Sequence, residues 1–200
     1  MKGTLAHRLA AIRQPFTTQE ALAHGISRAT LFRAVKDGRL LRRCHGVYEL
    51  PDAPDGNPNR DFETLAVKGV PFVVSLVSAL YLHGITTQVP RQIWIALPPG
   101  TRTPVPGSVP VECQRVKEPA YSFGARRMDL GGFSVPVYSP AKTVADCFKF
   151  RGKVGLDVSL EALHDGWRQK KFTVDELMEA ARVDRVERIV RPYAEGMLAP

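Results

Sequence analysis

The sequence predicts an α/β chain, of the α+β kind, in which a small helical domain ending in a hairpin precedes a larger domain of mixed strands and helices. Three observations lead to this prediction. Residues 1–50 show helical spacing and then two strand-like segments, residues 51–60 are rich in Pro, Gly, Asn and Asp, and both periodicities recur after residue 60. We therefore expect domains at 1–50 and 61–200, joined by a linker at 51–60.

The composition is that of a globular protein with an excess of positive charge towards its N-terminal end. Of the 200 residues, 44% are hydrophobic and 24% are charged, and the formal net charge is +8. Residues 1–50 hold nine Lys/Arg and three Asp/Glu, so most of the net charge lies on the first domain. This distribution favours a polyanionic partner for that domain.

Neither a membrane span nor a secretory signal is visible in the sequence. The longest apolar run, residues 70–82, is interrupted by Pro71 and two serines, and the early apolar stretch contains His7 and Arg8. We therefore expect a cytoplasmic protein with no membrane partner.

The three cysteines are too scattered for a disulfide framework or a zinc site, so we expect reduced thiols.

The first domain begins with the start and stop signals of two helices. We expect a helix over residues 5–13, because Pro15 follows it, and a second helix up to residue 24. Residues 17–20 (TTQE) offer a capping box for the second helix, and Gly25 ends it.

A third helix follows after a short turn, which is the order of a helix-turn-helix. Ser27 is a good N-cap for a helix over residues 28–37, and Gly38 terminates it. On a helical wheel, apolar residues cluster on one side, and small, hydroxyl and cationic residues lie on or near the other. Such a face suits base readout in the major groove of DNA. The residues expected to face the bases are Arg28, Thr30, Arg33 and Lys36.

Residues 39–50 contain two short strand-like segments around a turn at His45-Gly46. A hairpin directly after a recognition helix is a wing, so we expect a winged helix-turn-helix that binds double-stranded DNA. Cations on a wing neutralise phosphates and make the affinity fall with salt. The residues expected in this role are Arg39, Arg42, Arg43 and His45. A winged helix that docks a protein partner instead of DNA stays open as the alternative.

The second domain shows alternating strands followed by helices. Helical spacing occurs over residues 62–70 and 77–81, and apolar alternation occurs over 92–97, 109–116 and 133–138. The C-terminal part is predicted to be helical, with helices that begin at Ser139-Pro140 and others over 157–168, 173–182 and 184–193.

Several blocks of residues resemble those of a known family. They are residues 16–21 (FTTQEA), 25–28 (GISR), 38–40 (GRL), Arg43, 46–48 (GVY), 78–84 (SALYLHG), 94–98 (WIALP) and 139–148 (SPAKTVADCF). In this order they resemble the AbiEi-type antitoxins, the regulators of type IV abortive-infection toxin–antitoxin systems. The resemblance implies a repressor that binds inverted repeats in its own promoter. It also implies a C-terminal domain that counteracts a nucleotidyltransferase-like toxin without forming a stable complex with it.

We expect no enzyme, and therefore no catalytic residue, metal site or cofactor. A nucleotidyltransferase needs a Gly-Ser pair followed by paired acidic residues, but Val109-Pro110 follows the single Gly-Ser pair. The Glu-x-Lys of a nuclease and the glycine patterns of nucleotide-binding loops do not occur. A nuclease-like enzyme fused to a DNA reader is the remaining enzymatic alternative, and metal-dependent cleavage would support it.

Basic residues of the predicted helix after Ser139 are candidates for an antitoxicity surface. Lys142 and Asp146 are one helical turn apart and are expected to pair on its exposed face. The candidate surface comprises Lys142, Lys149, Arg151 and Lys153, and a merely solvated charged face is the alternative.

Overall fold

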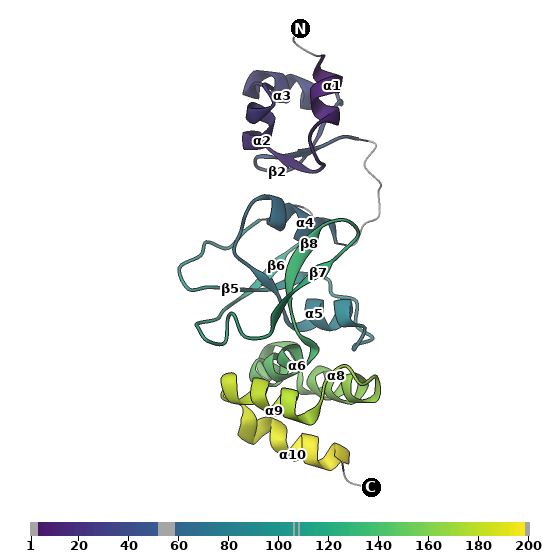
Figure 1. Ribbon diagram of the computed structural model, residues 1–200, viewed down its shortest axis with the longest axis vertical. Helices are drawn as coiled ribbons and strands as arrows, with labels where there is room; N and C mark the ends of the chain where they lie inside the picture. The colour runs from purple at the N-terminus through teal and green to yellow at the C-terminus, as the bar shows by residue number, and fades with distance from the viewer. Residues whose placement is uncertain (1–3, 52–58, 106, 108, 199–200) are drawn as a thin grey trace. The chain divides into compact units, whose positions relative to one another are not determined.

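The computed structural model describes residues 4–51, 59–105, 107 and 109–198 (Figure 1). Within these residues the chain forms ten helices and two β-sheets, which confirms the expected α+β class. The chain divides into two compact units, Met1–Val70 with Pro104–Val109, and Pro71–Thr103 with Pro110–Pro200. Most of the expected linker, residues 52–58, lies outside the described residues.

The first unit opens with the three helices of the expected motif, α1 (Leu5–Ala10), α2 (Thr18–Ala23) and α3 (Arg28–Lys36). The capping box is present at α2, because the hydroxyl of Thr17 accepts from the backbone N–H of Glu20 and the Glu20 carboxylate accepts from that of Thr17. The hydroxyl of Ser27 caps α3, accepting from the N–H of Thr30 at 3.2 Å. Local chemistry therefore determines where α2 and α3 begin.

A three-stranded antiparallel sheet completes the motif. It comprises β1 (Phe16–Thr17), β2 (Leu41–Cys44) and β3 (Val47–Glu49) in the order β1-β3-β2. The hairpin β2–β3 lies where the wing is expected, and its turn uses the positive φ of Gly46, +79°. We refer to this hairpin as the wing. Strand β1 has two residues, too few for a period-2 pattern in the sequence.

The first unit is larger than the expected domain, because helix α4 (Arg60–Val67) belongs to it. Glu49 at the end of β3 is 3% exposed, and one of its oxygens accepts from Nη2 of Arg60 at 3.0 Å. The other oxygen is bound by Arg43. These ion pairs join the wing to α4, so this part of the unit continues past residue 50 to Val70.

The second unit contains a mixed five-stranded sheet in the order β6-β5-β4-β8-β7. Pairs β5/β6 and β4/β8 are parallel, and pairs β4/β5 and β7/β8 are antiparallel. The sequence does not predict the edge strand β7, which reads ARRMD and is largely exposed. The strands are β4 (Val73–Val74), β5 (Ile93–Leu97), β6 (Val111–Arg115), β7 (Ala125–Asp129) and β8 (Ser134–Tyr138).

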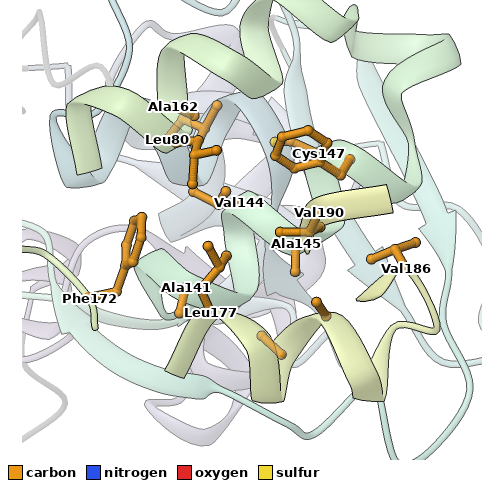
Figure 2. Packing of buried hydrophobic residues seen from close by; sticks show 14 of the residues in the cluster. Leu80, Ala141, Val144, Ala145, Cys147, Ala162, Phe172, Leu177, Val186 and Val190 are labelled. Atoms are coloured by element: carbon orange, nitrogen blue, oxygen red, sulfur yellow. The ribbon is translucent and has the colours of Figure 1, made fainter. Parts of the chain in front are cut away.

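Helix α6 is the centre of the second unit's helical part. Its residues 141–148 are all buried, and it packs against α5, α8, α9 and α10. Figure 2 shows Leu80, Val144, Ala162, Leu177 and Val190 from these five helices in one apolar cluster. The helices are α5 (Leu76–His83), α6 (Pro140–Lys149), α7 (Arg151–Val154), α8 (Leu156–Arg168), α9 (Val174–Val183) and α10 (Glu187–Leu198).

Candidate nucleic-acid interface

Helix α3 buries one side and exposes the other, as its sequence predicts. Leu31 and Ala34 are buried in the core of the first unit. Of the four residues expected to face bases, three have exposed side chains and Thr30 is half-buried. The three exposed residues are Arg28, Arg33 and Lys36.

A hollow of about 830 Å³ lies between α3 and the wing. Its α3 side is formed by Arg28, Phe32 and Lys36, which are four residues apart and therefore share one face of the helix. Val35, also on α3, lines the hollow too, and the lining residues from outside α3 are Thr18, Arg42, His45, Gly46 and Tyr48. The hollow thus combines cations from two elements with an apolar wall.

Phe32 lines this site, although it is not among the DNA-contacting residues that the sequence predicts. Its side chain is 72% exposed, the same fraction as Val89 and the highest among the exposed large hydrophobic residues of the described chain. The signal was available, because a helical wheel places Phe32 between Arg28 and Lys36 and away from Leu31. An aromatic residue on the exposed face of a recognition helix is suited to contact thymine methyl groups.

Thr30 and Arg33 lie on the side of α3 away from the hollow. The hydroxyl of Thr30 is 2.9 Å from that of Ser27, so it takes part in the N-cap. Nε of Arg33 donates to the carbonyl of Ala29 at 3.4 Å, and the rest of its guanidinium is exposed. Neither residue lines the hollow.

Two of the expected wing residues act as a pair. Nη2 of Arg42 donates to Nδ1 of His45 at 2.9 Å, and its Nε donates to the carbonyl of Cys44 at 3.3 Å. Both side chains line the hollow. Arg39 lies in the turn between α3 and β2 instead of on the wing, where it pairs with Asp37 at 2.9 Å while remaining 57% exposed.

Arg43 does not have the expected role, because its side chain is only 11% exposed. Its guanidinium binds the Glu49 carboxylate and donates to the carbonyl of Arg60 at 3.1 Å. It also donates to the hydroxyl of Thr64 at 3.4 Å, and it lies 3.9 Å from Glu63. Adjacent residues of a strand point to opposite faces, so Arg43 points to α4 while Arg42 points to the hollow. The prediction of Arg43 as a phosphate contact is therefore wrong.

Lys142 is also placed differently from the prediction. It pairs with Asp146, as expected, at 2.6 Å, but its side chain is fully buried instead of lying on an exposed face. Asp184, in the turn between α9 and α10, covers it and lies 3.0 Å from Nζ. The ammonium also lies 4.5 Å from the centre of the Tyr138 ring. Lys142 therefore cannot belong to a surface.

Burial of this charge cluster has an electrostatic consequence. It raises the pKa of Asp146 to about 7, and the nearby Asp184 adds to this effect while Lys142 opposes it. Burial likewise raises the pKa of Tyr138 well above its usual value. The buried Lys142 thus opposes the effect of burial on the carboxyl group of Asp146 only in part.

The other three candidates for an antitoxicity surface are at least partly exposed. Lys149 is 32% exposed and lies 3.4 Å from Asp184, and Lys153 is 50% exposed and binds Glu112 at 2.7 Å. Arg151 is exposed and donates to the carbonyl of Phe148 at 2.9 Å.

Comparisons with known proteins support the interpretation of the N-terminal segment. Residues 6–51 match the family model described as "Transcriptional regulator, AbiEi antitoxin", which confirms the resemblance over this segment. Among solved structures, the RV2827C protein from Mycobacterium tuberculosis is similar, with a TM-score of 0.64 and 16% identity. The alignment covers 96% of this chain and 78% of that one, so the two share a fold. A search of curated proteins found no match.

Proposed function

We propose that the chain is a transcriptional repressor that places α3 in the major groove of double-stranded DNA. The observation that carries the proposal is the hollow between α3 and the wing, with Arg28 and Lys36 on one side and Arg42 on the other. These three side chains are exposed, and they lie within residues 1–50, which hold nine Lys/Arg and three Asp/Glu. The major groove admits an α-helix, and a wing beside it reaches the phosphate backbone.

The proposed division of labour separates base readout from phosphate binding. Arg33 and Lys36 donate to guanine acceptors, Arg28 and Thr30 approach the DNA from the first turn of α3, and Phe32 contacts thymine methyl groups. Arg39, Arg42 and His45 hold the backbone. Arg43 is left out, because it is committed to Glu49.

We further propose that the DNA is an inverted repeat in the chain's own promoter, bound by two copies. The match of residues 6–51 to a transcriptional regulator and antitoxin supports the general regulatory role on which this proposal builds. The same match supports an antitoxin role in general. We propose that the antagonist is a toxin of the nucleotidyltransferase kind, with which the chain forms no stable complex.

The test is a gel-shift titration of the full chain on its upstream promoter fragment and on a scrambled fragment of equal length. Titrations run at about 50 and 200 mM salt, a range over which phosphate-dominated binding weakens strongly. We expect a preference for the promoter that persists at the higher salt. Equal or absent binding on both fragments would contradict the proposal and favour a winged helix that binds a protein, for which the exposed Phe32 is suited.

Substitutions at Phe32 and Arg33 test base readout. We expect Phe32→Ala and Arg33→Ala each to reduce the preference for the promoter about tenfold, the loss typical of a base contact. Binding to scrambled DNA should change little for Phe32→Ala, because no charge is removed. Equal losses on both fragments for Phe32→Ala would show that the residue does not read sequence.

A further inference from the structure

The second unit has a hollow that the DNA-binding proposal does not use. It has a volume of about 650 Å³, within the usual range of small-molecule sites. Three segments that are far apart in the sequence form it. They are residues 115–120, from the last residue of β6 onward, residues 149–151, where α6 meets α7, and residues 183–189, where α9 meets α10. All three belong to the same compact unit.

The rim of this hollow is cationic. Its five basic residues are Arg115, Lys117, Lys149, Arg151 and Arg185. The two carboxylates at the rim are occupied, since Asp184 is bound by Lys142 and Lys149, and Glu118 accepts from the N–H and hydroxyl of Ser122. Within the described residues, the side chains of Lys117 and Arg185 make no ion pair or hydrogen bond. The rim therefore offers uncommitted positive charge.

The floor of the hollow is apolar. Val116, Ala120 and Val186 are 4%, 8% and 5% exposed, and Phe150 and Ile189 are half-buried beside them. An inorganic anion would gain nothing from such a floor. A ligand with a flat apolar part and an anionic part would use both, because bases stack on aromatic rings and cations bind phosphates.

The backbone at Arg185 is unusual for an arginine. Its φ is +60°, a left-handed conformation. The N–H of Val186 donates to the carbonyl of Ala181 at 2.8 Å, so Arg185 occupies the position after a helix C-terminus where glycine is usual. Lys170 at the end of α8 has the same conformation, with φ +54°, but it does not line the hollow. Glycine is therefore compatible with the fold at both positions.

We propose that this hollow binds a nucleotide, with the base packed on the apolar floor beside Phe150 and Ile189 and the phosphates at Lys117 and Arg185. The nucleotide is either free or the terminal unit of a nucleic acid strand. This site lies in the other unit from α3 and the wing, so the proposal does not depend on promoter binding.

The test is a fluorescence titration of the full chain with N-methylanthraniloyl-ATP, followed by competition with ATP, adenosine, pyrophosphate and a short single-stranded RNA. Arg185→Gly removes a rim cation without backbone strain, and Lys170→Gly is the matched control with the same change of charge and conformation. We expect Arg185→Gly and Lys117→Ala each to raise Kd at least about fivefold, and Lys170→Gly and Lys36→Ala to change it less than about twofold.

The competitors show whether the ligand is a free nucleotide or a strand end. They also test whether the apolar floor contributes to binding. Stronger competition by ATP than by RNA supports a free nucleotide, and the reverse supports a strand end. ATP should compete better than either pyrophosphate or adenosine. The proposal is overturned by an absence of saturable binding, by equal weakening in Arg185→Gly and Lys170→Gly, or by pyrophosphate competing as well as ATP. Promoter binding by Arg185→Gly should equal that of the unaltered chain, which separates failure here from failure of DNA binding.

Discussion

Arg42 and Arg43 are neighbours in β2, and their side chains have different surroundings. Arg42 lines the hollow beside α3, whereas Arg43 is buried against Glu49 and α4. At the scale of single residues, charge alone therefore does not identify a DNA contact. The burial of each cation decides whether it is available to phosphate or serves the fold.

Alanine substitutions at these two positions separate the roles. Arg42→Ala should weaken binding to all DNA sequences and reduce the slope of log K against log salt by about one, with little effect on stability. Arg43→Ala leaves the buried Glu49 with one partner fewer, so it should lower the free energy of unfolding by about 2–4 kcal/mol. Salt-dependent binding and urea unfolding measure the two effects. A salt slope reduced by Arg43→Ala in a chain of unchanged stability would contradict this assignment.

The buried carboxyl of Asp146 predicts a pH-dependent stability. Its pKa is about 7 in the folded chain and about 3.9 when unfolded, so between these values the folded state binds the proton and the unfolded state does not. The contribution of this group to the free energy of unfolding is therefore fully present below about pH 4. It decreases as the pH rises from 4 to 7, and it is absent above pH 7. Asparagine mimics the protonated carboxyl and removes this dependence.

Urea unfolding at several pH values, on the unaltered chain and on Asp146→Asn, measures the effect. The stability of the variant relative to the unaltered chain should rise between pH 5 and 8. A difference that stays constant over this range would show that Asp146 does not bind a proton there.

At the scale of elements, α8 and α10 each contain a glycine within the helix. Adding a side chain at these two glycines has opposite consequences for stability. A Cβ at Gly166 would collide with the ring of Phe172, which is 5% exposed and cannot move aside. A Cβ at Gly196 in α10 would meet no atom within 4 Å. Gly166 therefore permits close packing, whereas Gly196 only costs helix propensity.

Alanine at each of these glycines tests the distinction. Gly166→Ala should destabilise the chain by about 1–3 kcal/mol through overpacking. Gly196→Ala should stabilise it by up to about 1 kcal/mol, less if the end of α10 frays. Thermal unfolding of both variants provides the comparison. Stabilisation by both substitutions would mean that Phe172 does not pack on α8 as described.

At the scale of the whole molecule, the first unit includes α4 and is not confined to residues 1–50. A fragment of residues 1–70 should therefore unfold at a higher temperature than one of residues 1–50, because it keeps the pair between Glu49 and Arg60 and the buried Phe62 and Leu65. Circular dichroism melts of both fragments measure this. In the longer fragment, Arg60→Ala should remove part of the difference, and equal melting temperatures would contradict the assignment of α4.

The sequence by itself determined the elements that depend on local chemistry. Thr17, Ser27 and Thr173 start helices where their hydroxyls cap the backbone, and Gly46 permits the tight turn of the wing. The resemblance of the N-terminal segment to an antitoxin regulator was also visible from these motifs. Such signals act over a few residues, so they are complete in the sequence.

Only the tertiary structure decided which polar residues are exposed and which strands join the sheet. Arg43 and Lys142 are buried because Glu49 and Asp184 come from other elements to pair with them, and Phe32 is exposed because α3 turns its other face to the core. Strands β4 and β7 owe their place to β8, which pairs with both. The physical reason is common to all of these cases: burial and pairing depend on residues distant in the sequence, which a local pattern does not contain.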